Sequence, residues 1–115
     1  MVHQVIFYPA GESSNIIVEF YRKLNVSTRR KIIKAAKYLE EYGIVPEIGN
    51  IKKLKGYDFW EVRILGKDNI RLFIIEIGSS IYVLNIFRKK TQSTPLQELK
   101  LTQKRLHALK NELDR

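Results

Sequence analysis

Hydrophobic and polar residues alternate through the second half of the chain, and this period-two pattern predicts β-structure there. Three segments rich in β-branched and aromatic residues carry the pattern: 57–65, 70–77 and 80–88. The connections between them, GKDN and GSS, are short and of the hairpin type, so we expect an antiparallel meander. A further short segment of this composition, 2–8, ends at a proline and predicts a first strand.

Apolar residues at one-turn spacing predict helices on both sides of the meander. The first helix is expected over 15–24, after a Ser-Ser-Asn cluster suited to capping. A second is expected to begin at Ser27, as its N-cap, and to end near Tyr42, where Gly43 follows. The two helices therefore lie between the first strand and the meander in sequence.

A third helix is expected at the end of the chain. Thr94, Pro95 and Gln97 have the spacing of a capping box with proline in the first turn. An apolar stripe follows it: Leu99, Leu106, Leu109 and Leu113. The order β-α-α-β-β-β-α predicts an α+β fold in which a small antiparallel sheet packs on helices, and with no repeat or linker in view we expect one domain over 1–115.

The opening turn of the second predicted helix has an unfavourable charge pattern. Arg29, Arg30 and Lys31 stand in succession where the helix dipole favours anions. Two interpretations are open: a solvated, screened helix face, or a binding site for a phosphate or an acidic partner.

Composition narrows the possible functions of these 115 residues. The chain is 44% hydrophobic and 29% charged, which is typical of a globular protein. It has no cysteine, and its two histidines, His3 and His107, lack the spacing of metal ligands, so neither a metal centre nor another cofactor is expected. No apolar run approaches the ~20 residues of a membrane span and no signal peptide is evident, so we expect a cytoplasmic protein without membrane contact.

The net charge indicates the kind of partner. Twenty-one Lys and Arg residues oppose twelve Asp and Glu residues, which gives +9. A surplus of this size on a small protein favours a polyanion, either a nucleic acid or an acidic protein.

Strand alternation places several of the charges together. If the aliphatic sets of the meander face the helices, Glu61, Arg63, Arg71, Asn85 and Lys89 all point to the opposite, open face of the sheet. The result would be a cationic concavity.

Arg71 is the most informative of these residues, because it interrupts the apolar run NIRLFIIEI where a buried strand favours aliphatic side chains. A cross-strand salt bridge with Glu61 would explain it without a ligand. A phosphate would also suit its planar guanidinium, and both interpretations can hold together if Glu61 orients Arg71.

Two further basic groups flank the predicted sheet. Lys52, Lys53 and Lys55 precede it in the segment IKKLKG, and Arg88 and Lys90 stand on either side of Lys89. Such clusters are common on solvated loops, and they are also what an RNA-binding approach to the sheet would require.

The segments KKLKGYDFWEVRI and NIRLFIIEIGSSIYVLNIFRKKTQSTP, followed by a closing helix with KRL, resemble the HigB-type, phage-associated branch of the RelE/ParE toxin superfamily. Its members typically carry K-x-L-x-G, a W-E-x-R strand, a strand arginine and F-x-K-K-T-x-x-T-P before the last helix. The resemblance covers essentially the whole chain. The sequence departs from the pattern at Ile70, where the family commonly has tyrosine.

The resemblance implies a RelE-like toxin of a type II toxin–antitoxin system. Such a toxin is a metal-independent endoribonuclease that cuts mRNA, usually on the translating ribosome. Its implied partners are an acidic cognate antitoxin, often of the helix-turn-helix type, and operator DNA only through that antitoxin. The ParE branch has the same fold and poisons DNA gyrase, so a non-catalytic toxin that acts on a protein target is the alternative.

The family's phosphate-binding arginine and lysine positions fall on Arg63, Arg71 and Lys89, which alternation selects independently. Glu61 joins them as a candidate catalytic residue. The expected RNA-binding residues are Lys52, Lys53, Lys55, Arg88 and Lys90. With no histidine near the sheet, either Glu61 or a lysine of lowered pKa would have to transfer protons, or electrostatic stabilisation alone would supply most of the rate.

Overall fold

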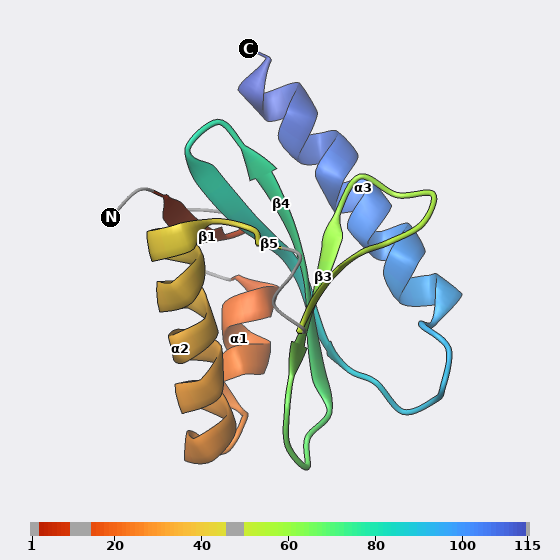
Figure 1. The fold of residues 1–115 in the computed structure, drawn as a ribbon. Helices are drawn as coiled ribbons and strands as arrows, with labels where there is room; N and C mark the ends of the chain where they lie inside the picture. The colour runs from red at the N-terminus through yellow and green to blue at the C-terminus, as the bar shows by residue number, and fades with distance from the viewer. Residues whose placement is uncertain (1–2, 10–14, 46–49, 115) are drawn as a thin grey trace.

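A twisted, five-stranded mixed sheet forms the centre of the protein in the computed structural model, which describes residues 3–9, 15–45 and 50–114 (Figure 1). The strands are β1 (Gln4–Phe7), β2 (Ile51–Lys53), β3 (Trp60–Ile64), β4 (Ile70–Ile77) and β5 (Ser80–Arg88). Their order across the sheet is β1-β5-β4-β3-β2. The three strands β3 to β5 are consecutive antiparallel neighbours, so the predicted meander is confirmed.

Two features of the sheet differ from the prediction. The first strand pairs with β5 in parallel, which makes the sheet mixed rather than antiparallel. The segment expected to be a basic approach to the sheet contains an additional edge strand, β2, antiparallel to β3. The observed order is therefore β-α-α-β-β-β-β-α, within the α+β class that was predicted.

Helices cover both faces of the sheet (Figure 1). Helices α1 (Ile16–Arg22) and α2 (Val26–Tyr42) lie on one face, and α3 (Leu96–Leu113) lies on the other. In the described ranges, no helix combines the length and the apolar character needed to span a bilayer.

Each face of the sheet has its own hydrophobic core, because successive strand residues point to opposite sides. The core under α1 and α2 is aliphatic and includes Ile17, Ile32 and Leu72. The core under α3 is more aromatic: Phe73 contacts Phe59 in a tilted arrangement and Phe87 edge-to-face, with ring centroids 5.1 and 5.0 Å apart. The face predicted to be open is therefore covered by α3 over much of its area.

A β-bulge in β5 changes which side chains face α3. Phe73 pairs with Asn85 and Ile74 pairs with Val83, so Leu84 is the extra residue between them. Leu84 was expected beside Ile86, but it packs in the core under α3, while Ile86 faces the other core. Asn85 lies on the face where it was expected, but α3 covers that face and leaves Asn85 only 3% exposed.

The helix starts were only partly predicted. Asn15 caps α1 as expected, its side chain accepting from the backbone N–H groups of Ile17 and Val18, whereas Ser13 and Ser14 lie outside the described residues. The Ser27 cap is wrong: the N-cap of α2 is Asn25, which accepts from the Thr28 N–H at 2.8 Å.

The capping box predicted at the start of the last helix is also wrong. Pro95 is the N-cap of α3 and makes no side-chain cap hydrogen bond, so Thr94 and Gln97 form no capping box. Of the predicted stripe, Leu106 and Leu109 are buried, Leu99 packs against their core, and Leu113 is 46% exposed.

The cationic first turn of α2 has an anion from another part of the chain beside it. The Asp68 carboxylate, in the β3–β4 hairpin, accepts hydrogen bonds from the side chains of Asn25 and Thr28 and pairs with Arg88 at 3.5 Å. This negative charge interacts favourably with the positive end of the helix dipole and offsets the unfavourable effect of the neighbouring cations. The hydrogen bond from Thr28, above all, lowers the pKa of Asp68 from its ordinary value.

We expect the Asp68→Asn substitution to lower the thermal stability of the protein. Because the folded-state pKa of Asp68 is lowered, its ionised form stabilises the fold above the ordinary value of 3.8, and this contribution is lost as the pH falls from there through the folded-state pKa. Thermal unfolding followed by circular dichroism between neutral and acidic pH should show a larger difference between wild type and variant at neutral pH. Asp58→Asn is the matched control, because Asp58 is 71% exposed and its ion pair within the described residues is with the Lys110 amine at 3.5 Å. Equal melting curves for wild type and Asp68→Asn at neutral pH would contradict this role.

Candidate functional site

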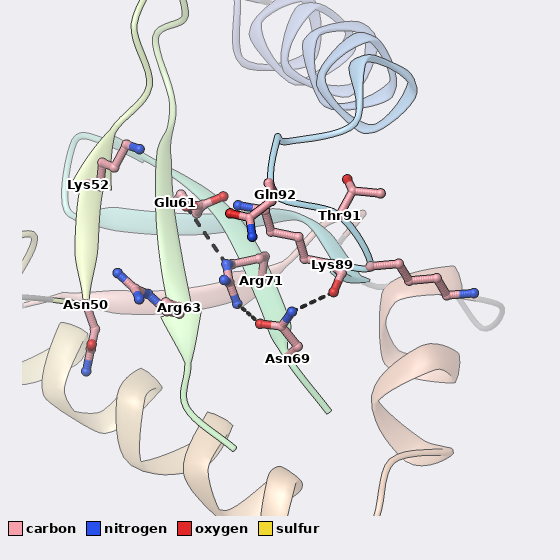
Figure 2. A pocket seen from close by; sticks show the side chains of 10 residues that line it. Asn50, Lys52, Glu61, Arg63, Asn69, Arg71, Lys89, Thr91 and Gln92 are labelled. Carbon is pink, nitrogen blue, oxygen red and sulfur yellow. Dashed lines mark hydrogen bonds and ion pairs between the residues drawn. The ribbon is translucent and has the colours of Figure 1, made fainter. Parts of the chain in front are cut away.

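A cavity of about 640 Å³ opens on the α3 side of the sheet, beside the loop that joins β5 to α3 (Figure 2). Among the described residues, five cationic side chains and one carboxylate line it: Lys52, Arg63, Arg71, Lys89, Lys90 and Glu61. The other lining residues are Asn50, Asn69, Thr91 and Gln92. A concave site with this charge suits an anionic ligand.

Arg71 is held firmly at the floor of this cavity. Its residue exposure is 7%, and Nη1 donates to the side-chain oxygen of Asn69 at 2.8 Å and to the backbone carbonyl of Ile70 at 3.3 Å. Its Nε is buried and has no hydrogen-bond partner within the described structure. Since a buried N–H normally has a partner, this donor is an unsatisfied group at the site.

Glu61 is the one carboxylate among the described residues that line the cavity, and it lies diagonally across from Arg71, opposite Phe73 in the strand register. Glu61 Oε1 is 4.0 Å from Arg71 Nε, too long for a direct hydrogen bond, and Oε2 is buried without a partner. Both predicted interpretations of Arg71 are therefore compatible with the structure. Glu61 supplies a counter-charge, and the guanidinium keeps an unused donor.

A second guanidinium adds positive charge next to Arg71. Arg63 on β3 is the direct cross-strand partner of Arg71 on β4, and like charges in such positions repel. In Figure 2 the two side chains point apart, Arg63 toward the side of Asn50 and Arg71 toward Asn69. Burial lowers the pKa of Arg71, the charge of Glu61 opposes this change, and the charge of Arg63 adds a smaller lowering. The guanidinium stays cationic at neutral pH.

Asn69 connects the two strand ends that carry the cations. Its backbone is left-handed, with φ of 52°, a conformation that asparagine tolerates better than most residues. Its side chain donates to the carbonyl of Lys89 at 2.6 Å and accepts from Arg71, and the Lys89 N–H donates to the Asn69 carbonyl at 2.9 Å. Asn69 therefore fixes the start of β4, the end of β5 and the Arg71 guanidinium relative to one another.

Not every predicted site residue lies at the cavity. Lys52 and Lys90 line it, with Arg63, Arg71, Lys89 and Glu61. Lys53 points elsewhere, and its amine donates to the carbonyl of Tyr57 in the β2–β3 turn. Lys55 lies exposed in that turn, and Arg88 is exposed and paired with Asp68, so these three residues can contact only a ligand that extends beyond the cavity.

Four uncharged lining residues were not predicted from the sequence. Thr91 and Gln92 belong to the K-K-T-Q stretch that follows β5, where their proximity to the lysines was a usable signal. Asn50 and Asn69 gave no such signal, because an asparagine near a turn is ordinarily explained by the turn itself.

The histidines lie away from this site. His3 pairs with Glu76 at 3.0 Å, and His107 is exposed on α3. Neither lines the cavity, and the described residues include no cluster of three or more His, Cys, Asp or Glu that could hold a metal ion. The described residues that line the cavity offer guanidinium, amine, carboxylate, amide and hydroxyl groups for any chemistry performed here.

Comparison with solved structures defines the class of fold. The chain is similar to E. coli toxin RelE, solved in the free state as a double-arginine mutant, with a TM-score of 0.64 and 18% sequence identity. The match covers 91% of this chain and 98% of that chain. The protein therefore has a RelE-like α+β fold.

Comparison with family models identifies the family. Residues 19–107 match the family described as "Phage derived protein Gp49-like (DUF891)". The chain belongs to this phage-derived, HigB-like family, which confirms the resemblance seen in the sequence. No curated protein matches the chain at a significant level.

Proposed function

We propose that this protein is the toxin of a type II toxin–antitoxin system and acts as a metal-independent endoribonuclease on mRNA at the translating ribosome. The observation that carries the proposal is the convergence of Arg63, Arg71 and Lys89 on one cavity, with a buried and unpaired N–H on Arg71. The RelE-like fold and the phage-derived family support it.

The arrangement suits cleavage of RNA through its own 2′-hydroxyl. In this reaction the 2′-oxygen attacks the adjacent phosphorus and the bond from phosphorus to the 5′-oxygen breaks, which leaves a 2′,3′-cyclic phosphate and a 5′-hydroxyl. Negative charge on the non-bridging oxygens grows in the five-coordinate transition state. Arg71 donates to these oxygens through its planar fork, and Arg63 and Lys89 add positive charge nearby.

Two protons must also move, one from the 2′-hydroxyl and one to the departing 5′-oxygen. In the described cavity, Glu61 is the carboxylate that can accept a proton, and Lys52, Lys89 and Lys90 are the amines that can donate one. Lys52 is the cross-strand partner of Glu61, so an acid and a base stand side by side. Because Glu61 Oε2 is buried, its first role is to orient Arg71 through the carboxylate-to-guanidinium contact.

The proposed partners follow from charge. A chain of +9 attracts the phosphates of mRNA and of the ribosome, and an acidic antitoxin would neutralise it by salt-sensitive binding. Contact with operator DNA would come through a helix-turn-helix segment of the antitoxin.

Primer extension on reporter mRNAs tests the activity. Brief induction of the wild-type protein should produce discrete cuts, and a translation inhibitor that keeps ribosomes off the message should remove them. Cuts that persist without ribosomes would remove ribosome dependence from the proposal, and growth arrest without any cuts would overturn the nuclease.

The second candidate function is a non-catalytic toxin that acts on a protein target such as DNA gyrase. One observation favours it: neither His3 nor His107 lies at the cavity, so the conventional acid and base of a metal-free ribonuclease is missing. Growth arrest with intact messages would support this candidate, and the basic cavity would then be a binding surface.

A further inference from the structure

A second concave region lies on the other face of the sheet, between α2 and the edge formed by β2 and β3. It is a groove of about 380 Å³ with an aliphatic floor that includes Leu39, Ile51, Val62 and Ile64. Leu65 at its end is 56% exposed, which is unusual for a large aliphatic side chain beside a core. The groove is within the size range of binding sites and offers apolar surface that the described chain leaves uncovered.

Positive charge borders this apolar floor. Lys31 and Lys34 stand on the α2 side and Arg63 on the β3 side, and all three are exposed. No acidic residue lines the groove in the described ranges, and no carboxylate there pairs with any of these three cations. Lys31 is held in place by a 2.9 Å hydrogen bond from its amine to the Leu65 carbonyl.

The chemistry of the groove selects one kind of occupant. Single-stranded RNA binds through successive bases stacked on aromatic or guanidinium planes, and the described lining offers one of each, Tyr38 and Arg63. Aliphatic side chains make up most of the floor between them. An amphipathic helix fits better, because leucine-like side chains one turn apart can fill an apolar groove. Carboxylates on its flanks would then meet Lys31, Lys34 and Arg63.

The groove also touches the catalytic cavity. Arg63 and Asn50 line both, because they lie at the edge of the sheet that separates the two. In Figure 2 the Arg63 side chain is turned away from Arg71 and toward Asn50, so the guanidinium stands near this boundary. A charge placed in the groove therefore acts on a residue of the cavity.

We propose that the groove binds an acidic amphipathic helix of a partner protein, and that this helix withdraws Arg63 from the catalytic cavity. A carboxylate in the groove offers Arg63 a salt bridge, and relief from its repulsion with Arg71 adds to the preference. The cavity then keeps Arg71 and Lys89 but loses one of its cations. Inhibition by this route leaves the cavity itself unblocked, and this second half of the proposal rests on the proposed ribonuclease function.

Binding is tested with a labelled synthetic peptide of about 15 residues, with leucines at one-turn spacing and glutamates elsewhere. In fluorescence anisotropy at low salt, we expect Lys34→Glu to weaken the affinity by about tenfold. Lys37→Glu makes the same charge change on the same helix outside the groove and should change the affinity by less than about twofold. No binding, or equal losses in the two variants, would overturn the docking site. A short labelled RNA that responds to Lys34→Glu while the peptide does not would assign the groove to nucleic acid instead.

The effect on Arg63 is read without any cleavage assay. The side-chain Nε–Hε resonance of Arg63, assigned by its disappearance in Arg63→Lys, should shift when the peptide saturates the wild-type protein. A bound peptide that leaves this resonance in place would overturn the withdrawal of Arg63 while leaving the docking site standing. Because neither readout uses RNA cleavage, a failure of the ribonuclease proposal would be seen separately in primer extension.

Discussion

Replacing Arg71 with alanine is expected to lower the rate of RNA cleavage by about 10²- to 10³-fold, which is the typical cost of removing one preorganised donor to a developing oxyanion. The guanidinium is already fixed by Asn69 and Ile70, so it reorganises little when the transition state forms. The loss should appear in the single-turnover rate, measured on a ribosome-bound message, and in the disappearance of primer-extension cuts.

Two control variants distinguish a catalytic role of Arg71 from unfolding and from a general effect of losing an arginine. Arg71→Lys keeps the positive charge beside Glu61 but not the planar fork, so it should fold like the wild type and still cleave more slowly. Arg22→Ala removes an exposed arginine in the last turn of α1, away from the cavity, and should leave the rate unchanged. Wild-type cleavage by Arg71→Ala would remove Arg71 from the catalytic residues.

The partner residue gives a complementary expectation. Glu61→Gln keeps the shape of the side chain and removes its charge, so Arg71 loses its counter-charge and the cavity becomes more positive. We expect slower cleavage but equal or tighter binding of a non-cleavable, 2′-O-methylated RNA. If the cleavage rate and the RNA affinity fall together, Glu61 stabilises the folded protein rather than orienting Arg71.

The central group of the site could be predicted because it depends on local geometry. Side chains two apart on a strand share a face, so alternation alone placed Glu61 with Arg63 and put Arg71 on the adjoining strand. The hairpins fixed which strands are neighbours, and the structure brings Lys89 to the same cavity. The alternation predicts only that these charged side chains lie together. The ribonuclease function proposed for the cavity depends on the family resemblance.

The remaining features depend on contacts between distant parts of the chain. The parallel pairing of β1 with β5 joins segments more than 70 residues apart. The short apolar sequence of β1 is equally compatible with an antiparallel edge strand. The anion at the N-terminus of α2 comes from Asp68, about 40 positions later, so the three cations of that turn could not be interpreted from their neighbours.

Helix α3 had the largest effect on the predicted site, because it covers the face on which Asn85 was expected and buries this side chain in a polar network. The amide of Asn85 donates to Glu98 Oε1 and to Thr102 Oγ1, each at 3.1 Å. On the same side, Arg105 Nη1 donates to the Leu84 carbonyl at 2.8 Å, and burial lowers the pKa of Arg105 while Glu98 opposes that change. Strict alternation put Asn85 on the correct face but could not show that α3 covers it, and the bulge turned Leu84 to the side opposite to the predicted one.

Asn85→Ala is therefore expected to cost about 2–3 kcal/mol of unfolding free energy, because it removes every side-chain hydrogen bond of Asn85 from a site that is closed to water. Part of the network should survive, since Thr102 also donates to the Glu98 carbonyl at 2.7 Å and Arg105 keeps its bond to Leu84. Urea unfolding should show a midpoint lower by about 1 M or more, given typical slopes of 1–3 kcal/mol per M. Asn111→Ala, an exposed asparagine on the same helix, should leave the midpoint unchanged. If both variants unfold at the wild-type midpoint, the polar network contributes nothing to the docking of α3, and the aromatic core beneath that helix must hold it alone.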